Sequence, residues 1–315
     1  MKARLAVLAV AVVAAAGCGP AKLRSTVDGT PPPRVMAEFW VEPERGRDLY
    51  HGPWGARNAP GAETIFKFKD STSGGFSPKW DITDPSGREW GVKMGAEAQA
   101  EVTASRILWG VGYHQPPNYF LPRARVDNGS QVQHIGPGRF RPSLPELDEK
   151  GPWAWRENPF VDTPQYRGLL VLLMMLNSTD LKDDNNSLYE LQRPREGARR
   201  WYVVRDVGSS LGDTGWTPNR NDIEAFEKAP FVTGIEGGYV TFEDKGRHTS
   251  LLERLRPEDV VWTCERLQRL TPRQWRDAFR AGGYDEATTE RYLRSLREKI
   301  EQGLAFKTGT AGGRR

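Results

Sequence analysis

An uninterrupted apolar run, Leu169–Leu176, constrains the fold of this chain more than any other feature. The run leaves no polar face, so a helix over it must be buried on all sides. It is also far shorter than the roughly 20 residues that a helix needs to cross a bilayer. A chain of 315 residues with 37% hydrophobic and 27% charged residues is long enough to build the surrounding core, as one large domain or as two lobes. Its net charge of +4 gives no indication of a nucleic-acid partner.

The N-terminal residues have the pattern of an export signal. A short cationic region is followed by an Ala/Val/Leu run, and the sequence Ala15-Ala16-Gly17-Cys18 resembles the bacterial lipobox. We therefore expect residues 1–17 to be a lipoprotein signal peptide and Cys18 to carry the lipid. The alternative is an ordinary signal peptide with an incidental cysteine. The lipid would anchor an exported protein to a bacterial membrane, on its periplasmic face or at the cell surface, and the proline-rich residues 18–47 would form a tether.

The remaining chain predicts strands first and helices later. Three strands bounded by turn residues form an antiparallel meander, and a proline-free segment after them suits an amphipathic helix. A loop-rich stretch, a buried helix, a hairpin and a helical C-terminal region follow. The expected elements are strands at 64–68, 76–82 and 89–94, a helix at 96–111, a short strand at 119–121, loops at 123–164, a buried helix at 166–176, hairpin arms at 187–192 and 200–205, and helices within 251–306.

Four features occur in an order that suits phosphoryl transfer. A lysine ends a predicted strand (Lys93), an acid lies in the next helix (Glu101), and two acidic segments begin at Asp180 and Asp206. Phosphoryl transfer needs a lysine for the phosphates, an acid that orients this lysine, and an aspartate that receives the acceptor's hydroxyl proton. It also needs oxygen ligands for Mg²⁺, which Asn185 and Asp206 can supply.

These residues resemble the motifs of the protein-kinase-like superfamily. Asp180 and Asn185 have the spacing of the kinase catalytic loop, and Asp206-Val207-Gly208 resembles the kinase DFG metal motif. The close spacing of Lys93 and Glu101 is more similar to phosphatidylinositol kinases and HipA-type bacterial kinases, and the longer runs around these motifs resemble an uncharacterised group of bacterial kinase-like proteins.

The resemblance covers roughly residues 60–300 and implies an α+β, two-lobed kinase-like fold. A small lobe (48–125) would contain an antiparallel sheet with one helix, a larger lobe (126–305) would be mainly helical, and residues 306–315 would be a disordered tail. The implied site residues are Asp180 and Lys182 as catalytic residues, Lys93, Glu97, Glu101, Ser73 and Gly74 for ATP, and Asn185 and Asp206 for Mg²⁺ or Mn²⁺.

Two functions remain open from the sequence. The first is an ATP- and metal-dependent phosphotransferase with an unknown acceptor. The second is a kinase-derived binding module of the cell envelope, because the segment Ser71–Phe76 is not a GxGxxG loop, no His-Arg precedes Asp180, and an exported protein meets little ATP. In either case we expect Asp180, Asp206 and a nearby Glu to crowd negative charge that Lys93 offsets only in part. Cys264, the second cysteine, is expected to be a buried, inert thiol.

Overall fold

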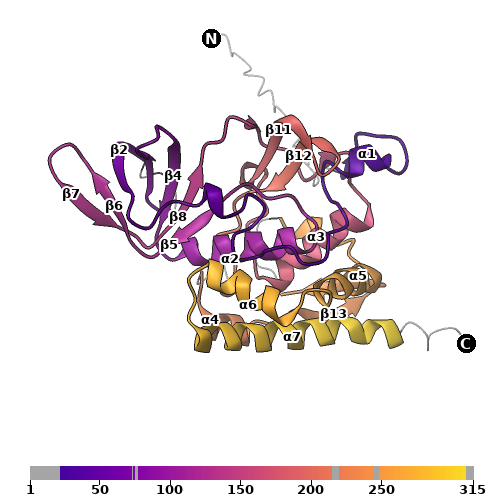
Figure 1. Cartoon of the computed structure of the whole chain (residues 1–315). Coiled ribbons are helices and arrows are strands. Elements are labelled where there is room, and N and C mark those ends of the chain that lie inside the picture. Colours follow the sequence, from indigo (N-terminus) through magenta and orange to yellow (C-terminus); the bar gives the residue numbers. More distant parts are fainter. Residues whose placement is uncertain (1–21, 73, 75–76, 215–219, 244–247, 310–315) are drawn as a thin grey trace, which may run out of the picture.

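The computed structural model describes residues 22–72, 74, 77–214, 220–243 and 248–309. These residues form two lobes, with a large sheet at one end and a helical body at the other (Figure 1). This is the α+β, two-lobed architecture that the kinase resemblance implies. The expected signal peptide and Cys18 lie outside the described residues.

The small lobe is built on a seven-stranded sheet of order β5-β8-β4-β3-β2-β6-β7. Its centre is the expected meander β2–β3–β4, in which every neighbouring pair is antiparallel, and β6 adds to β2 in parallel. Apolar residues at alternate positions of the central strands form a separate core that includes Phe66, Ile82, Trp90 and Phe140. The strands are β2 (Ile65–Thr72), β3 (Lys79–Thr83), β4 (Glu89–Met94), β5 (Tyr119–Leu121), β6 (Ala124–Asp127), β7 (Val132–Ile135) and β8 (Gly138–Pro142).

The expected small-lobe boundary and the loop at 123–164 are both wrong. Residue 125 lies within β6, and the sheet continues to the end of β8 at Pro142. The stretch also contains β9 (Leu147–Gly151) and β10 (Glu157–Asn158). Prolines and glycines in the sequence hid these strands, because they occupy the connections and strand ends, where proline costs no ladder hydrogen bond.

One helix, α2 (Glu97–Gly110), packs against this sheet, as predicted, and joins it to the large lobe. Nearly every α2 residue is buried, because β4 and β8 contact one side of it and α6 (Pro272–Ala281) another. Figure 1 shows α2 between the sheet and the C-terminal helices. The acidic and basic side chains of α2 therefore need partners inside the protein.

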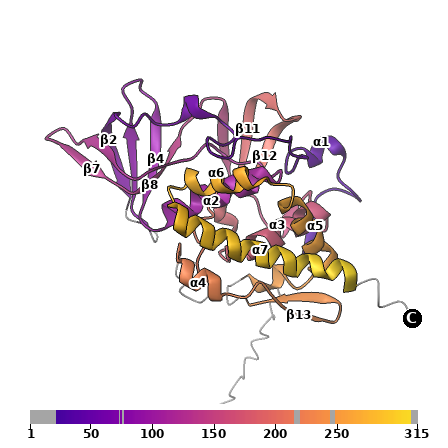
Figure 2. The same cartoon turned by 60° about the horizontal axis from the view of Figure 1, so that its bottom comes forward.

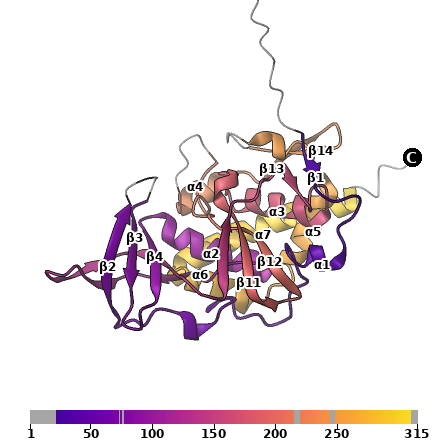
Figure 3. The ribbon, with the colours of Figure 1, turned by 90° about the horizontal axis from the view of Figure 1, so that it is seen from above.

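The large lobe surrounds α3 (Pro164–Met175), which contains most of the apolar run. Residues Leu169–Met175 are buried throughout, as predicted. Helix α5 (Pro257–Leu267) packs on both α3 and α7 (Glu286–Gly309), and Figure 2 shows α7 along the face formed with α4 (Ile223–Lys228) and α6. The expected hairpin is present as β11 (Asn186–Arg195) and β12 (Ala198–Val204), and β9 pairs with the other edge of β11. Figure 3 shows this hairpin set apart from β2 and β3. A second hairpin consists of β13 (Val232–Glu236) and β14 (Tyr239–Phe242).

Residues 22–47 are not a free tether. Strand β1 (Arg24–Ser25) pairs with β10, helix α1 (Pro33–Met36) follows, and Phe39 is fully buried against Phe160 with ring centroids 4.5 Å apart. Trp40 donates a 2.8 Å hydrogen bond to the Val111 carbonyl. The prolines suggested a spacer, but the apolar residues that follow them pack on the large lobe.

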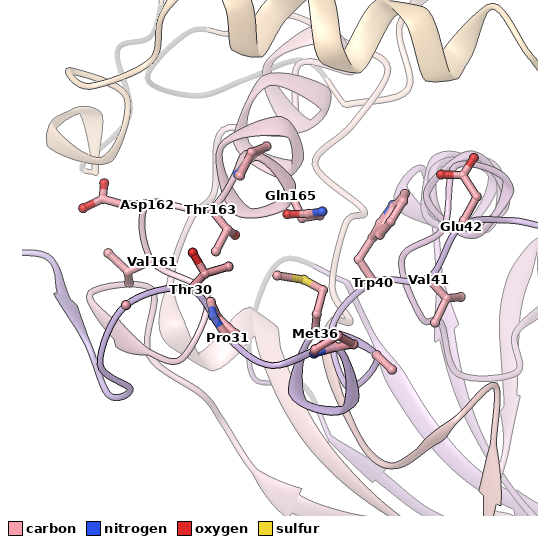
Figure 4. A pocket seen from close by; sticks show the side chains of 14 residues that line it. Thr30, Pro31, Met36, Trp40, Val41, Glu42, Val161, Asp162, Thr163 and Gln165 are labelled. Carbon is pink, nitrogen blue, oxygen red and sulfur yellow. The ribbon is translucent and has the colours of Figure 1, made fainter.

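This N-terminal segment and the loop before α3 enclose a hollow of about 640 Å³ (Figure 4). Its walls include Met36, Trp40, Val161 and Gln165.

The C-terminal helix is longer than predicted. Helix α7 continues to Gly309, so residues 306–309 belong to it, and the rest of the predicted tail lies outside the described residues. Within the ranges that the structure describes, no helix is both long and apolar enough to cross a membrane.

Candidate functional site

The candidate site is centred on Lys93, near the end of β4. Side chains alternate between the two faces of a strand, so Lys93 and Gly91 share a face, and the ladder places Arg139 and Arg141 of β8 opposite them. Lys93 is only 3% exposed. Its Nζ lies 2.8 Å from Glu97 Oε2, 3.1 Å from Glu101 Oε2 and 2.9 Å from Asp206 Oδ1. Three predicted site residues thus share this one ammonium group.

Both acids of α2 point toward Lys93 because they are one helical turn apart. Glu97 also accepts a 2.9 Å hydrogen bond from the Ser77 hydroxyl and pairs with Arg220. Its carboxylate is therefore held by groups from the sheet and from the large lobe.

Glu101 is fully buried and binds two arginines of β8. Arg139 Nε and Arg141 Nη2 each lie 2.9 Å from its Oε1. Burial acts to raise the pKa of Glu101, but Arg139, Lys93 and Arg141 outweigh it and lower this pKa. Glu101 consequently stays ionised inside the protein.

Asp206 follows β12 and reaches Lys93 from the large lobe. Lys93 donates to both of its carboxylate oxygens, at 2.9 and 3.1 Å. Burial acts to raise the pKa of Asp206, but Lys93 and, to a lesser extent, Arg139 lower it to about 2. The ion pair therefore joins the two lobes at neutral pH.

Gly208 allows this close approach. A Cβ at this position would lie 3.0 Å from Glu97 Cβ and 3.1 Å from Lys93 Nζ. Any larger residue would therefore press against the acid and the lysine of the site.

The segment between α3 and β11 lies next to Asp206. The Asn185 carbonyl accepts hydrogen bonds from the backbone N–H groups of Arg205 and Asp206, at 2.9 and 3.0 Å, and the Asn185 side chain donates to the Asp180 carbonyl at 2.6 Å. Lys182 Nζ lies 3.0 Å from Asp180 Oδ1. A continuous series of contacts thus links Lys93, Asp206, Asn185 and Asp180.

A cavity of about 670 Å³ adjoins this cluster. Arg139 and Arg141 line the cavity and also bind Glu101, so the two features share a wall. The opposite wall comes from β9, β11 and the residues next to Asp206, including Tyr189 and Arg205. The cavity therefore lies between the two lobes.

The structure brings most of the predicted site residues together, but not all. Gly74 is exposed in the β2–β3 connection, and Ser73 lies outside the described residues. The expected excess of negative charge around Lys93 is wrong, because Arg139, Arg141 and Arg220 also pair with its acids. The alternation Arg139-Phe140-Arg141 was the available signal for two of these arginines, since it puts both on one face of a strand.

The fit of a divalent cation depends on the oxygen ligands available. Among the described residues, no group of three or more His, Cys, Asp or Glu side chains could hold a metal. Mg²⁺, however, keeps several waters and commonly takes only one or two carboxylates together with substrate phosphates. The Asp206 carboxylate and the Asn185 amide oxygen, which belong to two residues joined by a backbone hydrogen bond, are ligand types that match that limited requirement.

No family model matches this chain, and no match was found among curated proteins. Among solved structures it is similar to the Helicobacter pylori proinflammatory kinase CtkA, with 12% identity and a TM-score of 0.44 over 78% of this chain and 97% of that chain. It is also similar to the Golgi casein kinase, with 12% identity and a TM-score of 0.39 over 79% of this chain and 74% of that chain. Because both TM-scores are below 0.5, any activity has to be argued from the site itself.

Proposed function

We propose that this protein is an atypical kinase-like phosphotransferase that uses ATP and Mg²⁺ or Mn²⁺ and is anchored to the cell envelope through a lipid on Cys18. The observation that carries the proposal is the contact of one buried lysine with Glu101 and Asp206, with Asn185 bonded to the backbone of Asp206. These residue types match the parts that phosphoryl transfer requires.

Each residue has a role in this proposal. Lys93 would bind the nucleotide phosphates, and Glu97 and Glu101 would orient its ammonium group. Asp206 and Asn185 would hold the metal, which neutralises phosphate charge when it is bound. Asp180 would receive the proton of the acceptor hydroxyl. Lys182, paired with Asp180, would lie near the transferred group.

Metal and nucleotide should bind cooperatively. In the structure Lys93 contacts three carboxylates, including both oxygens of Asp206. With a metal held by Asp206, the Lys93 ammonium group would be free to contact a phosphate. A metal alone would leave the Lys93 ammonium group without the Asp206 counter-charge, and a phosphate alone would leave Asp206 without a cation. Each ligand should therefore favour binding of the other.

The direct Lys93–Asp206 pair also favours a second function. A site that satisfies its own lysine and aspartate without a ligand suits a kinase-derived binding module that has lost catalysis. Both functions agree with export and lipid anchoring, and the acceptor of the phosphotransferase remains unassigned.

Thermal unfolding with nucleotides and metals tests the proposal. ATP or GTP with Mg²⁺ or Mn²⁺ should stabilise the native protein by about 2.7 kcal/mol at a hundredfold excess over Kd. Asp206→Ala should abolish this shift, because it removes the metal ligand. Asp180→Ala should keep the shift and lose phosphate transfer from labelled ATP, because this residue serves only the chemical step.

The outcomes separate the two functions. No shift with any nucleotide and metal pair would overturn the phosphotransferase. A shift without phosphate transfer to the protein itself, to water or to a panel of hydroxyl acceptors would favour the binding module.

A further inference from the structure

Helix α2 also carries a buried cation, Arg106, on the side away from the Lys93 cluster. At 3.6 residues per turn, Arg106 lies about half a turn around the helix from Glu97. Its side chain is among the largest fully buried ones in the described chain, with 1% exposed. None of the contacts proposed for phosphoryl transfer involves it.

The Arg106 guanidinium has hydrogen bonds but no direct ion pair, and the Asp48 carboxylate acts on it only at longer range. It donates to Asn118 Oδ1 at 2.8 Å and to the Asn118 carbonyl at 2.6 Å. Its Nε is buried with no hydrogen-bond partner, and no carboxylate of the described residues forms an ion pair with it. Burial lowers the pKa of Arg106 to about 10. An unpaired cation in this position is costly for the fold.

The guanidinium is fixed in place from two sides. Gly52 lies so close that an added Cβ would be 2.5 Å from Arg106 Cζ, and its φ of +74° also disfavours a side chain. On another side the Tyr119 ring centroid lies 5.7 Å from Arg106 Cζ. The group is therefore preorganised, which lowers the entropic cost of binding a ligand.

Arg106 forms part of the wall of a cavity of about 410 Å³. The cavity has two chemically different parts. The polar part includes Arg106, Arg280 and His51, and the apolar part includes Phe120, Leu121, Pro122, Ala59 and Pro60. Arg280 and His51 are each paired with an acid: Asp277 lies 2.9 Å from Arg280, and Asp48 lies 2.7 Å from His51. The buried guanidinium of Arg106 forms no direct ion pair with a carboxylate of the described residues.

We infer that this cavity is a binding site for a small organic anion with a phosphate head group. The phosphate would contact the guanidinium groups of Arg106 and Arg280, which match phosphate oxygens through paired N–H donors. The organic part would lie against Phe120, Leu121 and Pro122. The ligand would thereby connect α2 and β5 of the small lobe to the end of α6.

This site is distinct from the proposed nucleotide site. The cavity between the lobes and the cavity beside Arg106 have no lining residue in common, and only the second has a wall residue from α2. The inference therefore does not depend on phosphotransferase activity.

Phenyl phosphate is the probe that matches both parts of the cavity. Calorimetric titration of the full chain, without nucleotide, should give one site that binds phenyl phosphate more tightly than inorganic phosphate at equal ionic strength. Arg280→Ala should weaken binding about tenfold through loss of one charge-assisted contact. Arg273→Ala is the matched control, because Arg273 lies on the same helix, is almost fully exposed and is not part of the cavity wall. It should bind as the wild type does.

Further variants keep the test decisive. Ala59→Glu places a carboxylate at the cavity and should block binding of the probe. This variant provides the test if Arg106→Met, which removes the buried guanidinium, fails to fold. Arg205→Ala, which changes the wall of the cavity between the lobes, should leave binding unchanged, and this result would separate the two cavities. Equal affinity in the wild type, Arg280→Ala and Ala59→Glu, or no binding of phenyl phosphate up to about 10 mM, would overturn the inference. Binding of benzoate but not of phenyl phosphate would overturn the phosphate assignment.

Discussion

Lys93 is a buried cation whose removal would leave acids from two elements without their shared partner. Its ammonium group contacts Glu97, Glu101 and Asp206, and its side chain is only 4% exposed. Arg139, Arg141 and Arg220 would compensate Glu97 and Glu101 in part, whereas the direct partner of Asp206 would be lost.

We therefore expect Lys93→Met to lower the free energy of unfolding by about 3–5 kcal/mol, the usual cost of breaking a buried ion pair. Urea denaturation measures this change. Lys69→Met is the matched control, because Lys69 also ends in an ion pair, with Glu89, but is 54% exposed. Its loss should cost less than about 1 kcal/mol. Equal costs for the two variants would contradict the role of Lys93 as the buried counter-charge.

The same contact sets the titration of Asp206. With a pKa of about 2 in the folded protein and a value near 3.8 without these contacts, Asp206 binds protons more readily in the unfolded state. Its contribution to stability is therefore present above about pH 4 and is lost as the pH falls through 2. In Lys93→Met the pKa of Asp206 should rise, because burial still raises this pKa and the lysine that lowers it is gone. Carboxyl NMR titration of both proteins checks this, and an unchanged pKa would argue against Lys93 as the main opposing charge.

At the scale of residues, the order of motifs was sufficient to predict Lys93, Glu97, Glu101 and Asp206 as neighbours. It was not sufficient for Arg139 and Arg141. Their position depends on the register of β4 with β8, which places Lys93 opposite Arg139. Such register is set by pairing between distant segments and is not visible in a local pattern.

Helix α7 contains a buried lysine with an unusual environment. Lys299 Nζ lies 3.2 Å from the Met175 carbonyl at the end of α3, 3.3 Å from Asn177 Oδ1 and 3.8 Å from the Phe226 ring centroid. Burial lowers its pKa to about 7. The neutral amine is thus favoured in the folded protein, whereas the unfolded chain keeps a pKa near 10.4.

The sign of the pH dependence follows from this difference. Between about pH 7 and pH 10 the unfolded state binds more protons, so Lys299 makes stability rise with pH, by up to about 1.4 kcal/mol per unit. Below pH 7 Lys299 is protonated in both the folded and the unfolded state, so the folded protein bears the full free-energy cost of burying this charge. We expect Lys299→Met to be more stable than the wild type at pH 6, with the difference shrinking toward pH 10. Denaturant unfolding across this range measures it, and a constant difference would refute the assignment.

Elements with strong local patterns were predictable, and those with mixed patterns were not. The apolar run predicted the buried helix α3, and α5 and α6 lie within the range 251–306 in which helices were expected. Residues 22–47 and 123–164 contain many prolines, and their short strands and buried aromatic residues are stabilised by partners far away in the sequence. Strand β1, for example, pairs with β10, and β6 pairs in parallel with β2.

At the scale of the whole molecule, α2 is held to the large lobe by several contacts beyond the Lys93–Asp206 pair. Gln99 donates to the Gly283 carbonyl at 3.1 Å and accepts from Asn221 at 3.1 Å, and Glu97 pairs with Arg220. These partners come from α6's C-terminal loop and from the segment that follows Asp206. A ligand at the cavity beside Arg106 would therefore act on a helix that already bridges both lobes, and this arrangement could not be read from the order of the motifs.

The proposed membrane attachment concerns the whole molecule, and its two cysteines allow a test. Cys264 is fully buried, its thiol pKa is raised by burial to about 12, and a Cβ added to Gly303 of α7 would lie 2.4 Å from its Sγ. A thiol so enclosed and protonated is a poor nucleophile. We therefore expect radiolabelled palmitate to enter the wild type and Cys264→Ser equally, and not Cys18→Ser. The acyl chains on Cys18 would supply the membrane affinity, at about 0.8 kcal/mol for each buried methylene, and stable anchoring takes more than one chain. Cys18→Ser would lose these chains and should therefore no longer be found in the membrane fraction. Label in Cys18→Ser, or its loss from Cys264→Ser, would contradict anchoring through Cys18.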